Sequence, residues 1–87
     1  MTINETVEEC TAILDSILDD TSVPRNIRRA ADEIKNILSD QNESIPFRAA
    51  SSLNILNKIT NDPNMPQHTR TLIWNLASQF EMISVGD

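Results

Sequence analysis

The segment DTSVPRNIR (residues 20–28) separates two apolar helical patterns, and the segment DPNMPQHTR (residues 62–70) repeats its outline further along the chain. Both segments have aspartate first, proline fifth and arginine ninth, with an apolar residue before the proline. Proline does not extend a preceding helix, but it fits the first turn of the next one. Each segment therefore predicts a corner between two helices, and the two corners predict two helical hairpins.

A short phrase marks the predicted helix starts: a small polar residue, an apolar residue and usually proline. A Ser, Thr or Asn side chain at such a place accepts a hydrogen bond from the first turn of the helix. Glu5, three residues after Thr2, completes a capping box. We therefore predict that the first residue of each phrase caps a helix, the phrases being Thr2-Ile3-Asn4, Ser22-Val23-Pro24, Ser44-Ile45-Pro46 and Asn64-Met65-Pro66.

Apolar residues recur between these starts at three- and four-residue spacing, which is the period of an α-helix. The chain has 87 residues, 39% of them hydrophobic, and its only glycine is Gly86. Short connections make successive helices run antiparallel. The sequence predicts one all-α domain over residues 1–87, an antiparallel four-helix bundle made of two related hairpins, residues 2–40 and 44–84.

The two predicted hairpins also match each other within their helices, at the offset of 42 that separates the two corners. Chance identity is the alternative in a chain rich in Ile and Leu, but the Asp, Pro and Arg matches favour a duplicated hairpin. The identical residues are Ile13, Leu14, Ile17, Asp20, Pro24 and Arg28 in the first hairpin, and Ile55, Leu56, Ile59, Asp62, Pro66 and Arg70 in the second.

Two family resemblances follow from these segments. The run from Asp20 to Ile27-Arg28-Arg29-Ala30-Ala31 resembles HEAT-type helical repeats, and the offset of 42 lies within the range of that family's period. The second copy has Leu72-Ile73 where that family has small residues. Over nearly its full length the chain also resembles a small family of short, acidic, helical archaeal proteins. That resemblance implies a four-helix fold and no known chemistry.

Charge and composition exclude several classes of function. The net charge of −6 argues against direct binding to nucleic acid. Residues 1–43 hold ten acidic against four basic residues, whereas residues 44–87 hold three of each. Residues 1–20 include six acids and no Lys or Arg, unlike a signal or transit peptide, and no apolar run is long enough for a membrane span. We expect a cytoplasmic protein.

The repeated Asp and Arg of the two corners form the most specific polar pattern. Asp20 with Arg28, and Asp62 with Arg70, are predicted to be structural corner pairs. The alternative is an anion site that joins Arg28, Arg70 and His68. Arg25, Arg28 and Arg29 oppose the dipole at a helix start, so they either form a solvated charged face or bind an anion.

The acidic residues of the first helix suggest a second kind of contact. Glu5, Glu8 and Glu9 share one helix surface and form a candidate acidic contact face for a basic partner. No glycine-containing oxygen-rich loop accompanies them, so no metal site is predicted.

Catalytic and cofactor sites are not predicted. Cys10 is the only cysteine, and it lies in an apolar stripe, while His68 is the only histidine and lies on a different predicted helix. Zinc needs three or four ligands, which no cluster in this chain supplies. A single cysteine in a protein without disulfides also fits a reducing compartment.

The second half of the chain has more apolar surface than one bundle face needs. Trp74 lies about 150° from the apolar stripe of the fourth helix, so it points away from the predicted core. Exposed aromatic surface is typical of an interface, but Trp74 also fits the edge of a neighbouring helix in the same molecule. The candidate interface residues are Trp74, Phe47, Ile55 and Met82.

From these features we predict a non-enzymatic helical module without a cofactor or small ligand, which forms a homodimer through its third and fourth helices. The alternative is an acidic modulator of a basic, nucleic-acid-binding protein. A small anion-binding protein is the third hypothesis.

Overall fold

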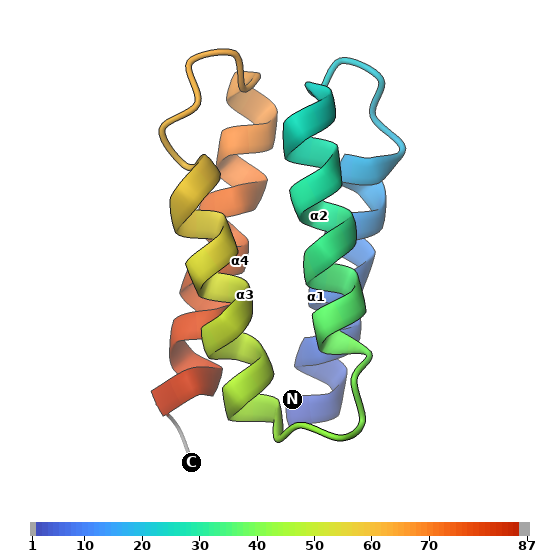
Figure 1. The fold of residues 1–87 in the computed structure, drawn as a ribbon, viewed down its shortest axis with the longest axis vertical. Helices are drawn as coiled ribbons and strands as arrows, with labels where there is room; N and C mark the ends of the chain where they lie inside the picture. The colour runs from blue at the N-terminus through green and yellow to red at the C-terminus, as the bar shows by residue number, and fades with distance from the viewer. Residues whose placement is uncertain (1, 86–87) are drawn as a thin grey trace.

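Four helices, and no strand, make up the secondary structure of residues 2–85, the part of the chain that this computed structural model describes (Figure 1). The helices are α1 (Ile3–Leu18), α2 (Arg25–Leu38), α3 (Ile45–Ile59) and α4 (Gln67–Val85). The predicted all-α class is confirmed.

Side-chain caps fix the starts of α1 and α3. The Thr2 hydroxyl accepts a hydrogen bond from the Glu5 N–H at 3.1 Å, and the Glu5 carboxylate accepts one from the Thr2 N–H at 2.8 Å. The Ser44 hydroxyl accepts a hydrogen bond from the Phe47 N–H at 3.3 Å. The predicted capping box and the predicted Ser44 cap are both confirmed.

The other two phrases do not start their helices where we predicted. The residue before α2 is Pro24, which has no side-chain capping bond, and α4 begins only at Gln67, after Pro66. The cap predicted at Ser22 is therefore wrong, and Asn64 likewise stands three residues before its helix. The reason is tertiary packing: Val23 and Met65 are buried in the core, so the chain stays in a turn until it reaches the proline.

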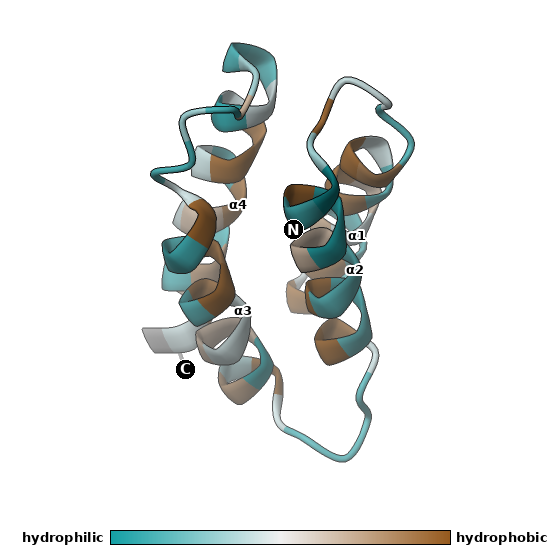
Figure 2. Ribbon diagram, turned by 45° about the horizontal axis from the view of Figure 1, so that its top comes forward, coloured by the Kyte–Doolittle hydropathy of each residue, from teal (hydrophilic) through white to brown (hydrophobic). Residues whose placement is uncertain are grey.

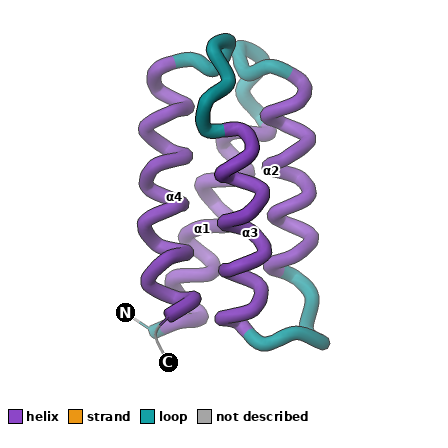
Figure 3. The backbone as a smooth tube through the Cα atoms, turned by 60° about the vertical axis from the view of Figure 1, so that its left-hand side comes forward, coloured by secondary structure: helices purple, strands orange, loops and turns teal. Residues whose placement is uncertain are grey.

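The helices form a closed ring in which each packs against two neighbours. The neighbouring pairs are α1 with α2, α2 with α3, α3 with α4, and α4 with α1, the last being the most sparsely packed. Both hairpin corners lie at one end of the ring, and the α2–α3 connection lies at the other (Figures 1 and 3).

This ring differs from the arrangement of a HEAT-type array. In a solenoid, helix pairs stack on one another, so equivalent helices of successive repeats lie side by side. Over the described helices, the equivalent pair α1 and α3 makes no close backbone contact, and neither does the pair α2 and α4. The HEAT-type resemblance therefore does not extend beyond the short segment that suggested it.

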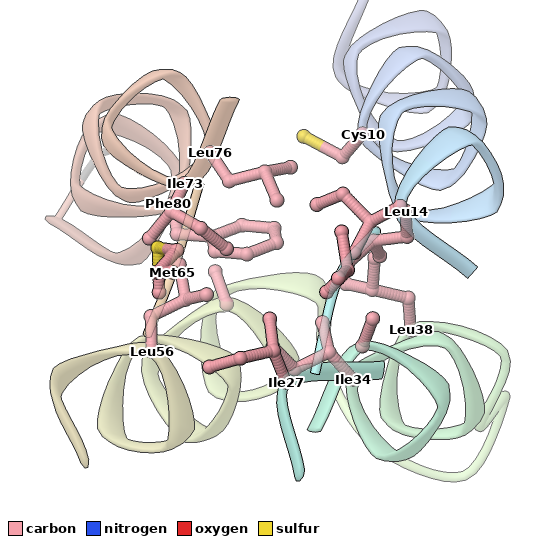
Figure 4. Packing of buried hydrophobic residues seen from close by; sticks show 14 of the residues in the cluster. Cys10, Leu14, Ile27, Ile34, Leu38, Leu56, Met65, Ile73, Leu76 and Phe80 are labelled. Carbon is pink, nitrogen blue, oxygen red and sulfur yellow. The ribbon is translucent and has the colours of Figure 1, made fainter. Parts of the chain in front are cut away.

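One hydrophobic core fills the centre of the ring. Hydrophobic residues turn inward along all four helices, whereas hydrophilic residues dominate the connections (Figure 2). Side chains from every helix meet there, among them Leu14, Ile27, Leu56 and Phe80, each with no exposed surface (Figure 4). Burying one such side chain contributes about 2 kcal/mol to stability, so the core is the main source of stability.

The two hairpins are equivalent in structure at the offset that their sequences share. The starts of α1 and α3, at Ile3 and Ile45, keep the offset of 42, and so do the starts of α2 and α4. Burial follows the same offset, since Leu14 and Leu56 are both fully buried, as are Ile34 and Leu76. This correspondence supports the interpretation of the chain as a duplicated hairpin.

All three connections contain the same aspartate turn. In each, the aspartate N–H donates to a carbonyl three residues back, and its own carbonyl accepts from the residue three ahead. One carboxylate oxygen accepts the N–H two residues ahead, at 2.9 Å for Asp20, 2.9 Å for Asp40 and 2.8 Å for Asp62. Such side-chain bonds replace the helical ladder where the chain must turn.

An arginine eight residues after each aspartate bonds back to the connection. Arg28 Nε donates to the Val23 carbonyl at 3.1 Å, and Arg48 Nε donates to the Glu43 carbonyl at 2.8 Å. Arg48 Nη1 also reaches the Leu38 carbonyl at 3.2 Å, and Arg70 Nη1 reaches the Thr60 carbonyl at 2.6 Å. The carbonyls of Leu38 and Thr60 lie at helix ends, where they lack partners within their own helix, so Arg48 and Arg70 satisfy groups that would otherwise be exposed or unpaired.

Two buried hydroxyl groups, those of Ser52 in α3 and Thr69 in α4, have no hydrogen-bond partner among the described residues. Both side chains are fully buried. Their equivalents in the first hairpin are Cys10 and Ile27, so the second hairpin has a more polar core at these two positions.

We expect Thr69→Val to raise the free energy of unfolding by about 1 kcal/mol. Valine keeps the shape of threonine but removes a hydroxyl that is buried without a partner. Urea unfolding followed by circular dichroism measures this difference. Thr71→Val, at an exposed position of the same helix, is the control and should leave stability nearly unchanged. A loss of stability in Thr69→Val would mean that the hydroxyl is bonded.

We expect Arg48→Lys to lower the free energy of unfolding by about 2 kcal/mol, because one ammonium group does not bridge the two carbonyls that the guanidinium holds. Arg48 is only 8% exposed, so water does not replace the lost bond. The exposed Arg25 of α2 provides the matched control, Arg25→Lys, measured in the same urea titration. Equal effects of both substitutions would contradict the role given to Arg48.

Candidate functional site

The two hairpin corners are joined by a reciprocal pair of hydrogen bonds, which we call the corner brace. Asp20 Oδ2 lies 2.7 Å from His68 Nε2, and Asp62 Oδ2 accepts from Asn26 Nδ2 at 2.7 Å. His68 and Asn26 are themselves equivalent at the offset of 42, so each aspartate reaches the equivalent position of the opposite hairpin. The brace ties the start of α2 to the corner before α4, and the start of α4 to the corner before α2.

The hydrogen bonds of the corners, those of the brace included, lower the pKa values of both aspartates. Hydrogen bonds from the Ser22 side chain and from His68, with the Ser22 N–H, lower the pKa of Asp20 to about 2, from an ordinary value of 3.8. Hydrogen bonds from Asn26 and from the Asn64 N–H, with the nearby charge of Arg70, lower the pKa of Asp62. Both carboxylates are therefore anionic at neutral pH and already accept hydrogen bonds within the protein, which suits a structural role.

The predicted corner pairs are present in the corners but not bonded to each other as expected. Among the described residues, the Asp20 carboxylate bonds Ser22 and His68, while Arg28 bonds the Val23 carbonyl. Arg70 reaches the backbone carbonyl of Asp62, at 3.0 Å, and not its carboxylate. The arginines bond backbone because the aspartate turn already uses the carboxylate oxygens.

The same bonds weaken the anion-site hypothesis. Arg28 and Arg70 already donate N–H hydrogen bonds to backbone carbonyls, and His68 lies against the carboxylate of Asp20. Two members of the predicted arginine cluster, Arg25 and Arg29, are exposed on α2, whereas Arg28 is half-buried. An anion placed there would compete with carbonyls and with Asp20.

Cys10 and His68 do not form a catalytic pair. The Cys10 thiol is buried and lies 3.4 Å from Gln79 Oε1, at the α1–α4 seam, whereas His68 belongs to the corner brace. Burial, reinforced by the charge of Glu9, raises the pKa of Cys10 to about 11. At neutral pH this sulfur is a protonated core atom, and only the thiolate is a strong nucleophile.

Within residues 2–85, no group of three or more His, Cys, Asp or Glu side chains has an arrangement that holds a metal ion. None of the helices described here is both long and apolar enough to cross a bilayer.

The predicted acidic face is exposed, but one of its three carboxylates already takes part in the capping box. Glu5, Glu8 and Glu9 are all exposed on α1. Hydrogen bonds from the backbone and side chain of Thr2 lower the pKa of Glu5, because its carboxylate completes the capping box. Only Glu8 and Glu9 remain for a partner without disturbing the start of the helix.

The predicted interface residues separate into two groups. Trp74 is 55% exposed and Met82 is 65% exposed, and both lie on α4. Phe47 is also 55% exposed, but it lies at the start of α3. Ile55 is half-buried and packs against the core, so it belongs to the interior edge of α3.

A groove lies between α3 and α4, and Trp74 lies one helical turn before Ser78, one of the groove residues. It is lined by Leu53 of α3 and by Ser78, Glu81, Met82 and Ser84 of α4. Phe47 precedes Leu53 by six residues, which places it about 120° around the helix from the groove. We define the α3–α4 face as Trp74 together with the five groove residues.

This face has little charge. In the described parts of α3 and α4 the exposed charged residues are Lys58 and Glu81, because Arg48 is buried and Arg70 is half-buried. Lys58 follows Leu53 by five residues, about 140° around α3, so Glu81 is the one charged member of the face. An exposed tryptophan and methionine beside a groove with one charge form the best candidate for a contact surface.

Comparison with known proteins gives the family. The model of the uncharacterised protein family UPF0147 matches residues 1–83. A UPF0147 protein of Methanosarcina acetivorans is 57% identical over 95% of this chain and 86% of its own length. One of Thermococcus kodakarensis is 40% identical over 93% of this chain and 99% of its own. The chain belongs to family UPF0147.

Solved structures agree with this membership and with the fold. The crystal structure of a UPF0147 protein from Thermoplasma acidophilum has a TM-score of 0.87 and 37% identity, covering 93% of this chain and 95% of that one. The crystal structure of the unknown-function protein MMP1188 has a TM-score of 0.88 and 41% identity, covering 92% and 91%. The predicted resemblance to short, all-helical archaeal proteins is confirmed.

Membership of UPF0147 brings no activity with it, so the function of this chain must be argued from its own surface. Sequence reasoning missed Arg48, although the spacing from Asp40 to Arg48 repeats that of the other two corners. It also missed Asn26, whose equivalence to His68 follows from the offset of 42. The groove beside Leu53 had no signal in the sequence, because it depends on how α3 meets α4.

The hydrogen bonds that Ser22 and His68 make to the Asp20 carboxylate predict a loss of stability in acid. The pKa of Asp20 is lower in the folded protein than in the unfolded chain, so its carboxylate stabilises the fold above pH about 4. That contribution is lost as the pH falls towards about 2. We expect Asp20→Asn to be less stable than the wild type at pH 5, with a smaller difference at pH 2.5. Urea unfolding at both pH values measures it.

Asp62→Asn is the companion variant and should behave in the same way, because the pKa of Asp62 is lowered too. A difference between the wild type and Asp20→Asn that does not change with pH would contradict the role of the carboxylate in the brace.

Proposed function

We propose that this protein is a small, non-enzymatic helical module that associates with a second copy of itself through the α3–α4 face. The observation behind the proposal is the exposure of Trp74 and Met82 beside the groove that Leu53 lines. Tryptophan is enriched among residues that dominate binding energy, because its large ring buries much surface with few rotatable bonds.

Trp74 and Met82 lie outside the core of the monomer. Trp74 and Met82 are absent from the core cluster, whose members include Ile73, Leu76 and Phe80 of the same helix. The alternative interpretation, in which Trp74 covers the edge of a neighbouring helix, requires a mostly buried ring. More than half of the Trp74 surface is exposed, which favours an intermolecular contact.

The distribution of charge favours a second copy as the partner. Each chain has a net charge of −6, with ten acidic and four basic residues in the first 43 positions. Two copies that met through α1 and α2 would bring like charges together, which is unfavourable. A contact through the α3–α4 face keeps the acidic hairpins apart, and a symmetric dimer needs only one kind of surface.

The acidic-modulator hypothesis has weaker support in this geometry. Glu5 holds the capping box, so a basic partner that recruited it would compete with the Thr2 N–H. Glu8 and Glu9 are then the only members of the predicted face that are free to bind, and exposed ion pairs contribute little each.

We expect the wild-type protein to sediment as a dimer, and Trp74→Ala to weaken dimerisation at least tenfold. Loss of an interface tryptophan removes more than about 1.4 kcal/mol of binding free energy. Sedimentation equilibrium over a range of concentrations gives both dissociation constants. Ile3→Ala is the matched control, because Ile3 is an exposed apolar residue of α1, outside the proposed interface.

Ile3→Ala should leave the dissociation constant unchanged. A monomeric wild-type mass at the highest concentration reached would overturn the proposal, as would equal weakening by the two substitutions.

A further inference from the structure

The exposed row on α4 is self-complementary. Trp74, Ser78 and Met82 are spaced four residues apart, so they follow one another along a single side of the helix. Ser78 lies two residues from Leu76 and two from Phe80, both fully buried, which places it opposite the core. A small residue therefore occupies the middle of the row, with one large apolar residue on each side.

Reversing the direction of this row places unlike residues opposite each other. When two α4 helices run antiparallel about a two-fold axis at Ser78, Trp74 faces the partner's Met82, and Met82 faces the partner's Trp74. The small serine allows close approach at the axis. Sulfur beside an aromatic ring is a favourable contact, so the apolar ends of the row match.

The groove gives the tryptophan ring a place to enter. It is lined by Leu53, Ser78, Glu81, Met82 and Ser84, and Trp74 is not among these residues. Because the groove is next to Met82, the partner's Trp74 reaches it in the antiparallel arrangement. One ring then fills each of the two symmetry-related grooves.

The position of the groove selects the same direction. In a parallel arrangement the partner's Trp74 would lie level with Trp74 itself, about two turns from the groove residue Met82.

We propose that two copies of this chain pair through antiparallel α4 helices, with the two-fold axis at Ser78 and Trp74 of each copy in the Leu53–Met82 groove of the other. This arrangement rests on the proposed self-association and specifies its geometry.

Disulfide cross-linking at single introduced cysteines tests the geometry. Ser78→Cys places two thiols at the axis, within reach of a disulfide, whose Cα atoms lie about 5–6 Å apart. Thr71→Cys is the matched control, because Thr71 is exposed and lies seven residues earlier on α4. Antiparallel pairing about Ser78 separates the two Thr71 positions by about 21 Å along the helices. The wild type, whose only thiol is the buried Cys10, should not cross-link.

We expect Ser78→Cys to form a covalent dimer on mild oxidation and Thr71→Cys to stay uncross-linked, as seen by non-reducing electrophoresis. Cross-linking of both variants would indicate parallel helices and overturn the geometry. Failure of Ser78→Cys to cross-link, in a protein that still sediments as a dimer, would overturn the geometry and leave the self-association intact. A monomeric mass for the wild type would overturn both the antiparallel geometry and the self-association.

Trp74 fluorescence provides a second measurement that needs no cysteine, because Trp74 is the only tryptophan. Its emission should shift to longer wavelength when the wild type is diluted below its dissociation constant, since the ring leaves the groove for water. Met82→Ala should move that shift to a concentration at least tenfold higher. Emission that is unchanged by dilution across the monomer–dimer transition would overturn the position of Trp74 in the groove.

Discussion

Reversal of the chain within a few residues, three times, is the constraint on which this fold depends. Each reversal leaves the last carbonyls of one helix and the first N–H groups of the next without partners. The aspartate turns at Asp20, Asp40 and Asp62 satisfy part of this demand, since each aspartate N–H donates to a carbonyl of the preceding helix. Arg48 and Arg70 satisfy more of it, because each bonds a carbonyl at the end of the preceding helix, whereas Arg28 bonds the connection itself. Because each arginine is on the following helix, its bonds also tie the first turns of that helix to the connection. The ring can then close around one core, since all three corners set the same geometry.

The corner brace joins the two hairpins to each other, which the turns alone do not do. Each turn is local, whereas the bonds from Asp20 to His68 and from Asp62 to Asn26 join residues 48 and 36 positions apart. They set the two hairpins side by side at one end, across from the α2–α3 connection. Along the α1–α4 seam, the most sparsely packed of the four, Cys10 meets Gln79. The hairpins are thus aligned mainly by the shared core and by the brace, and little by the α1–α4 contact.

Most of the fold follows from local sequence, and most of the candidate site does not. Helix positions follow from the apolar period and from caps such as Thr2 and Ser44, because those interactions involve residues a few positions apart. The cap predicted at Ser22 failed because burial of Val23, a tertiary effect, decides where α2 begins. Exposure of Trp74 was predictable from its angle on the helix. The groove beside Leu53 was not, because it depends on the packing of two helices.

The two hairpins share a scaffold, so their differences are the place to look for function. The first hairpin has the acidic surface and a fully apolar core at Cys10 and Ile27. The second has Ser52 and Thr69 at those positions, together with the exposed Trp74 and Met82. It therefore has fewer apolar groups inside and more outside than its counterpart. A hairpin that served only to complete the bundle would gain stability from the reverse arrangement, so the apolar side chains kept on its surface are best explained by a surface that meets them.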